Sequence, residues 1–324
     1  MATTAHEAQR TGEHRTLLTL LDRAADRGEG EAAIVSLLFA VLAVAVTALV
    51  IYGAYFGLIT ALILRSLFYS LVSAGGLLLV GLNARAGWTR LLCYGLVPVA
   101  LVPGFHLWQS YVDIIMRGAM ATPPDLWIFV GVMAVLLVLV RMALGWALVI
   151  LVGGAIAYAW FGYLIPGQYG HGGYDLRRLA STLMLSTEGI YGLPMGVAVE
   201  YIFLFALLGT LLMKIGTGEV FVDIARGLTG RMQGGPGLSA ALSSAMLGTI
   251  NGSAVANVVT TGTFTIPLMK RVGYSPILAG AIEAAASSAG QILPPVMGAA
   301  AFLMAEIIGV PYSQIALAAL VPGL

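Results

Sequence analysis

Long apolar segments, two of them interrupted by polar glycine-rich residues, constrain the fold of this chain most. Hydrophobic residues make up 59% of the 324-residue sequence and charged residues only 10%. A helix needs about 20 mostly apolar residues to cross a bilayer. Because hydrocarbon offers no partner to backbone N–H and C=O groups, only helices and closed barrels span it. The sequence therefore predicts an all-α integral membrane protein, folded as a multi-span helical bundle.

Apolar run length predicts six membrane-spanning helices ahead of the interrupted segments. They lie at about 34–53, 59–82, 89–109, 126–141, 143–163 and 193–213. Apolar residues share one helical face of residues 13–27 and charged residues occupy the other, which predicts an amphipathic helix. This helix would lie on the cytoplasmic membrane surface or in solvent. If residues 238–265 form a re-entrant hairpin, most of the 16 lysines and arginines lie on the side of the N-terminus. The positive-inside rule then predicts a cytoplasmic N-terminus.

Composition also divides the chain into four parts. The charged lead-in covers 1–30, the first membrane domain 31–165, a polar glycine-rich loop 166–192, and the remaining helical segments 193–324. The loop carries charged side chains among tyrosines. Two interpretations stay open for it: a docking surface for an external partner, or an ordinary interfacial loop with an aromatic belt.

The first interruption is the sequence Asn251-Gly252-Ser253. Glycine permits backbone angles that a helix interior refuses, so we expect a helix break there. Beyond it, Ser253, Asn257 and Thr260 or Thr261 share one helical face. Hydroxyl and amide oxygens suit an alkali cation, and a new helix N-terminus suits an anion. The alternative is that these small residues only let helices pack closely.

The second interruption follows at residues 283–298. Glu283, Ser287 and Gln291 form one stripe with Ser288 beside it, and Pro294-Pro295 ends the helix. An acidic side chain at membrane depth is costly and normally serves a cation or a proton path. Glu283 is therefore a candidate coupling acid, unless it lies at the level of the lipid headgroups. Two broken helices close together are typical of the binding site of a secondary transporter.

Other classes of function find less support. The near-zero net charge gives no nucleic-acid footprint, and Cys93 is the only cysteine, which excludes a cysteine-based metal site. The sequence contains no GxSxG motif and no histidine in either interruption, which disfavours an intramembrane hydrolase. A non-catalytic membrane scaffold or sensor is also disfavoured, because such a protein gains nothing from polar helix breaks.

Residues 252–270 and 283–306 resemble signature segments of the large membrane subunit of tripartite ATP-independent periplasmic (TRAP) transporters, in particular the fused TAXI-type permeases. The resemblance is strong over about 190–324, and residues 31–165 would correspond to the small membrane subunit. It implies an elevator-type carrier in the bacterial inner membrane, coupled to Na⁺ or H⁺, without a cofactor. The substrates it implies are organic acids delivered by a periplasmic solute-binding protein.

The resemblance also implies roles for particular residues. Asn251, Gly252, Ser253 and Asn257 match the tip of a re-entrant hairpin, and Ser287 to Pro295 match the unwound helix facing it. Substrate and cation would bind there, with Na⁺ held through Ser253, Asn257 and Ser287. The family has a second inverted repeat that these residues do not supply, so we expect the chain to continue beyond Leu324. Another two-repeat carrier without a binding protein is the alternative.

Overall fold

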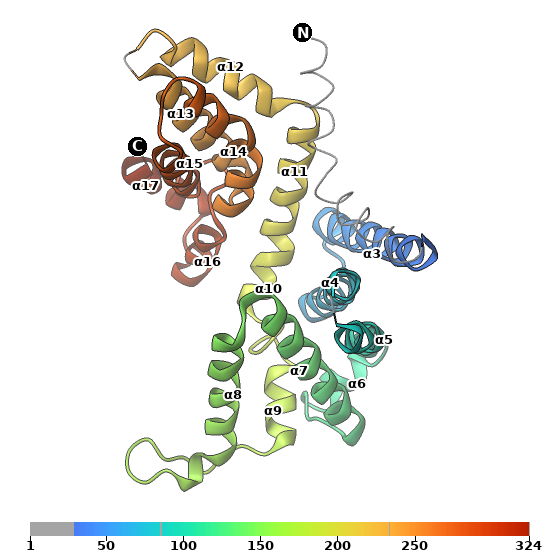
Figure 1. Cartoon of the computed structure of the whole chain (residues 1–324). Helices are drawn as coiled ribbons and strands as arrows, with labels where there is room; N and C mark the ends of the chain where they lie inside the picture. The colour runs from blue at the N-terminus through green and yellow to red at the C-terminus, as the bar shows by residue number, and fades with distance from the viewer. Residues whose placement is uncertain (1–28, 85, 233, 324) are drawn as a thin grey trace. The chain divides into compact units, whose positions relative to one another are not determined.

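The computed structural model describes residues 29–84, 86–232 and 234–323, and every regular element in these ranges is helical (Figure 1). The all-α prediction is confirmed. The predicted amphipathic helix at 13–27 lies outside the described residues. The chain divides into two compact units, one ending at Gly192 and the other beginning at Leu193. That division falls at the end of the predicted 166–192 loop.

The first unit carries long helices and a few short ones. They are α3 (Glu29–Phe56), α4 (Ala61–Asn83), α5 (Gly87–Gln109), α6 (Tyr111–Met116), α7 (Pro123–Leu144), α8 (Trp146–Phe161), η1 (Gly162–Leu164) and α9 (Leu176–Leu183). Helix α4 lies at the centre, where it packs against α3, α5 and α7. Its approach to α5 is close because Ser70 faces Gly104, whose backbone N–H donates to Ser70 Oγ at 2.9 Å.

The predicted loop at 166–192 contains an element that the sequence analysis did not anticipate. Residues 176–183 form the helix α9, which begins because the Asp175 carboxylate accepts a hydrogen bond from Arg178 N at 2.9 Å. The glycine density of the surrounding residues masked this short helix. Further along, the carbonyls of Tyr191 and Gly192 accept hydrogen bonds from Arg65 of α4 at 3.2 and 3.3 Å, which fixes the end of the unit.

The second unit holds both interrupted segments. Its elements are α10 (Leu193–Val197), the π-helical turn η2 (Ala198–Ile202), α11 (Phe203–Lys214), α12 (Thr217–Thr229), α13 (Gly235–Asn251), α14 (Ala254–Arg271), α15 (Pro276–Gly290), α16 (Ala299–Ile308) and α17 (Tyr312–Gly323). Helices α13, α14 and α15 pack on one another in every pairwise combination. Their shared apolar core is Ala240, Met269 and Ala279.

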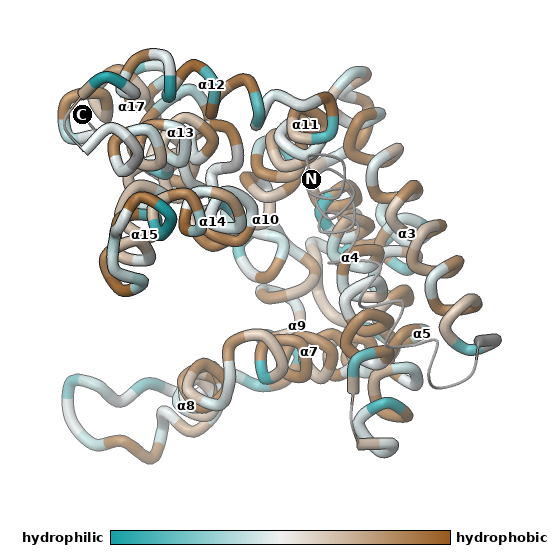
Figure 2. The backbone as a smooth tube through the Cα atoms, turned by 45° about the horizontal axis from the view of Figure 1, so that its top comes forward, coloured by the Kyte–Doolittle hydropathy of each residue, from teal (hydrophilic) through white to brown (hydrophobic). Residues whose placement is uncertain are grey.

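Six helical segments within the described residues are long and apolar enough to cross a membrane. They coincide with the six predicted spans, and the sixth is the composite segment α10–η2–α11, Leu193–Lys214. Their apolar character is visible as brown along the tube (Figure 2). Large apolar side chains are exposed along α3 and α8, as expected for surfaces that face lipid.

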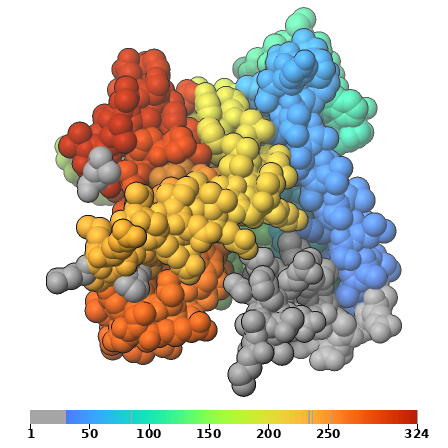
Figure 3. All heavy atoms as spheres, turned by 90° about the horizontal axis from the view of Figure 1, so that it is seen from above, coloured from blue at the N-terminus to red at the C-terminus, as the bar shows by residue number. Residues whose placement is uncertain are grey.

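Helix α12 differs from these spans because it is short and amphipathic. It runs across one face of the second unit (Figure 3) and packs on α13. Ala225 is buried, whereas Val220, Ile224 and Leu228 are exposed at a spacing of four residues. The exposed apolar side chains therefore form a stripe along one side of α12.

Candidate functional site

The first predicted helix break is present where the sequence placed it. Helix α13 ends at Asn251, Gly252 follows with φ +61°, and Ser253 begins α14 as its N-cap. Ser253 Oγ accepts a hydrogen bond from Ala256 N at 3.3 Å. Only glycine adopts this left-handed angle at little cost, and a Cβ on Gly252 would also collide with the carbonyl oxygen of Met297.

The second break lies directly against the first. Residues 291–298 are non-helical between α15 and α16. Val296 N donates to Thr249 O at 3.0 Å, in the last turn of α13. Gln291 Nε2 donates to Gly252 O at 3.4 Å. A backbone group near each break thus finds a partner in the other, which offsets the cost of burying it.

A contact between glycines brings these breaks together. Gly248 of α13 and Gly290 of α15 face each other so closely that a Cβ on Gly290 would lie 2.6 Å from the Gly248 Cα. The helix backbones therefore touch without intervening side chains. Gly290 is the last residue of α15, so this contact fixes where the unwound segment begins.

Glu283, seven residues before the end of α15, is completely buried. Hydroxyl groups from three helices surround its carboxylate. Thr261 and Thr265 of α14 donate to its carboxylate, the latter to Oε2 at 2.5 Å. Ser244 of α13 lies 2.8 Å from Oε1, and Ser287 lies 3.3 Å from the same atom. No ion pair among the described residues involves Glu283. Hydroxyl donors, rather than a basic side chain, therefore offset the cost of burying this carboxylate.

Asn257 connects this network to the helix break. Its Nδ2 donates to Ser244 O at 2.6 Å and lies 3.1 Å from Ser287 Oγ. Its Oδ1 is buried without a hydrogen-bond partner in the described part of the chain. A buried amide oxygen without a hydrogen-bond partner costs free energy, and a ligand that bonds to it would recover that cost. Asn257 Oδ1 is therefore a candidate ligand-binding atom.

The predicted site residues fall into three groups. Asn257, Thr261, Glu283 and Ser287 meet in the buried network. Gly252, Gln291, Pro294 and Pro295 lie at the two breaks, next to Asn251. Three hydroxyls point elsewhere: Ser253 caps α14, while Thr260 and Ser288 bond the carbonyls of Ala256 and Ala284 in their own helices.

Two members of the network were missed by sequence reasoning, Ser244 and Thr265. Ser244 sits in a helix rich in alanine and serine, where a small polar residue looks like a packing residue. Thr265 lies four residues after Thr261 and eight after Asn257, so extending the helical face by one more turn would have found it.

The first unit contains a second buried carboxylate, which the sequence analysis also missed. Asp125, in the first turn of α7, lies 2.6 Å from His106 Nε2 and 2.9 Å from Arg117 Nη2. Its side chain also accepts from Thr122 N at 2.7 Å, completing a capping box. These groups join α5, the 117–122 turn and α7. They stabilise the first unit because one buried carboxylate holds groups from all three segments.

Residues 130–324, more than half of the chain, match the family described as Tripartite ATP-independent periplasmic transporter, DctM component. The chain belongs to this family. The DctM family consists of secondary transporters and not of enzymes, which rules out the hydrolase alternative. The chain is thus a membrane component of the TRAP type.

Curated relatives include proteins named as TRAP large permeases, which agrees with this assignment. The chain is 27% identical over 188 residues to the uncharacterized protein y4mL of Sinorhizobium fredii, covering 58% of this chain and 40% of that protein. It is 24% identical over 151 residues to the 2,3-diketo-L-gulonate TRAP transporter large permease protein YiaN of Escherichia coli, covering 47% of this chain and 33% of that protein.

The chain is 27% identical over 154 residues to the C4-dicarboxylate TRAP transporter large permease protein DctM of Vibrio cholerae, covering 48% of this chain and 32% of that protein. The chain therefore spans less than half the length of these relatives. No solved structure is significantly similar to it.

Proposed function

We propose that this chain is the permease component of an ion-coupled transporter that takes up organic acids delivered by a periplasmic solute-binding protein. The supporting observation is that two helix breaks contact each other next to a buried network of hydroxyls around Glu283. Relatives named for C4-dicarboxylate and 2,3-diketo-L-gulonate transport favour an acidic substrate. The membrane would be the bacterial inner membrane, with the N-terminus in the cytoplasm.

The substrate carboxylate would bind at the N-terminus of α14. Helix α14 is 18 residues long and starts beside the unwound segment. Its first N–H groups and its dipole favour an anion. In this proposal α13 and α14 form the re-entrant hairpin of an elevator-type transport domain, with Gly252 and Ser253 at its tip. The part of the first unit ahead of residue 130, where the match to the DctM component begins, acts as the fused small subunit of a TAXI-type permease.

The buried network around Glu283 contains groups that suit either coupling ion, Na⁺ or H⁺. Asn257 Oδ1 and the hydroxyls of Ser244 and Ser287 are hard neutral oxygens, which suit Na⁺. The Glu283 carboxylate, with Thr261 and Thr265 against it, suits a proton carried across the membrane. Ser253, which the sequence analysis included in the Na⁺ site, would instead serve the substrate through the cap of α14.

Uptake by the full-length permease in proteoliposomes tests this proposal, with its binding protein outside and radiolabelled succinate as the probe. A Na⁺ or a pH gradient is imposed separately. We expect uptake to need the binding protein and one of the two gradients; uptake without the binding protein would favour the alternative carrier. If H⁺ is the coupling ion, Glu283→Gln abolishes pH-driven uptake, whereas Glu219→Gln on exposed α12 does not. Uptake that needs neither gradient would refute ion coupling.

A further inference from the structure

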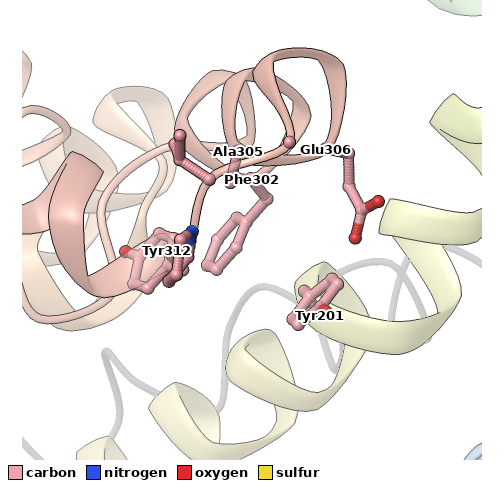
Figure 4. A pocket seen from close by; sticks show the side chains of 8 residues that line it. Tyr201, Phe302, Ala305, Glu306 and Tyr312 are labelled. Carbon is pink, nitrogen blue, oxygen red and sulfur yellow. The ribbon is translucent and has the colours of Figure 1, made fainter.

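A cavity in the same unit is lined by none of the residues of the Glu283 network. It has a volume of about 350 Å³ and lies between η2, α16 and the turn into α17 (Figure 4). Its walls include the aromatic side chains of Tyr201, Phe302 and Tyr312 and the carboxylate of Glu306. The volume falls in the range of small-molecule sites, which begin near 300 Å³.

Stacked aromatic rings form one wall of the cavity. The ring centroid of Phe302 lies 4.5 Å from that of Tyr312 and 5.4 Å from that of Tyr201, with the planes within 12° of parallel in both pairs. Phe302 is buried, whereas Tyr201 remains half-buried. Tyr312 is held in place because its hydroxyl donates toward the carbonyls of Pro295 and Val296. Phe302 is stacked between the two tyrosines (Figure 4), so the cavity has a fixed aromatic wall in which the outer faces of the tyrosine rings remain to attract a cation.

Negative charge gathers at the other side of the cavity. The Glu306 carboxylate extends toward Tyr201 (Figure 4). Within the described ranges, none of the ion pairs involves Glu306. Helix α16 also ends here, with Gly309 at φ +72° as its C-cap, and the C-terminal end of a helix carries partial negative charge. Charge and dipole therefore both favour a positively charged occupant.

The backbone that carries Tyr201 is itself unusual. Residues 198–202 form a π-helical turn inside the long segment Leu193–Lys214. Such insertions are rare and often lie at functional sites. The predicted spans gave no sign of it, because the apolar run continues unchanged through these residues.

We propose that this cavity binds an organic ammonium group, either on a free amine or on a lipid headgroup. Aromatic rings beside a carboxylate recognise alkylated ammonium groups through cation–π and charge interactions. An inorganic divalent ion would need more oxygen ligands than Glu306 supplies, and an organic acid would be repelled. This site shares no lining residue with the Glu283 network, and its ligand has a charge opposite to that of the proposed organic acid.

Saturation-transfer NMR tests the proposal, with choline as the probe and the full-length protein in phosphatidylglycerol nanodiscs. The matched probe is 3,3-dimethyl-1-butanol, which has the shape of choline without its charge. We expect a signal for choline and none for the neutral analogue. Glu306→Gln should weaken choline binding about threefold, because it removes an exposed opposite charge beside a cation that has no N–H to donate. Glu219→Gln, which makes the same change on α12, should leave binding unchanged.

Two further comparisons make the result decisive. Tyr201→Phe keeps the ring and should keep binding, whereas Tyr201→Leu should weaken it about threefold. Adding phosphatidylethanolamine to the nanodiscs should abolish the choline signal if the occupant is a lipid headgroup, and leave it unchanged if it is a free amine. Equal signals from choline and its neutral analogue, or unchanged binding in Glu306→Gln, would overturn the proposal.

Discussion

Replacing Thr265 with valine tests whether the hydroxyls around Glu283 stabilise the second unit. Valine has nearly the shape of threonine, so the change removes little besides a hydroxyl that lies 2.5 Å from Glu283 Oε2. Both residues are buried, so water cannot replace the lost donor. A buried acceptor left without its partner costs about 1–3 kcal/mol. We expect Thr265→Val to lower the free energy of unfolding by that amount.

The measurement is unfolding of the purified protein in mixed micelles, followed by circular dichroism during an SDS titration. Thr263→Val is the matched control, because Thr263 lies on the exposed face of the same helix, and we expect a change within about 0.5 kcal/mol. Repeating Thr265→Val in a Glu283→Met background completes a double-mutant cycle. An equal loss of stability in both backgrounds would refute the idea that the hydroxyl acts through the carboxylate.

Three other changes follow from the packing. Gly290→Ala should cost about 1–3 kcal/mol by overpacking, whereas Gly280→Ala, which meets open space, should stabilise by about 0.5–1 kcal/mol; equal effects in the same titration would contradict the backbone contact. Asp125→Ala should destabilise the first unit by about 1–3 kcal/mol, because His106, Arg117 and the Thr122 cap lose their common acceptor; a melting temperature like that of the parent would refute this. Gly252→Val should abolish uptake while the protein still inserts, and normal uptake would exclude this residue from the site.

The sequence was most informative where local chemistry decides the structure. Gly252 between two helical patterns predicted the first break, and Pro294-Pro295 predicted the end of α15 near the second. The spans were predictable because hydrocarbon imposes one length and one composition on every crossing. The burial of the Glu283 side chain among three helices depends on how those helices pack, and no local sequence pattern indicates it.

What could not be predicted depends on how helices rotate against one another. Thr260 and Thr261 are neighbours in sequence, yet only Thr261 faces Glu283, because the register of α14 against α15 is set by tertiary packing. Ser288 was expected beside the polar stripe and instead bonds its own helix. Asp125 and His106 are 19 residues apart on different helices, a separation that carries no periodic signal.

The origin of the four hydroxyls around Glu283 has a mechanical consequence. Ser244 belongs to α13, Thr261 and Thr265 to α14, and Ser287 to α15, the helix of Glu283 itself. Sliding any one of these helices past the others would strip donors from a carboxylate that has no water to replace them. In the elevator mechanism proposed above, the movement that carries substrate across the membrane meets far less resistance if α13, α14 and α15 travel together as a rigid body. Flexibility is then confined to the segments that tether this body to the rest of the permease.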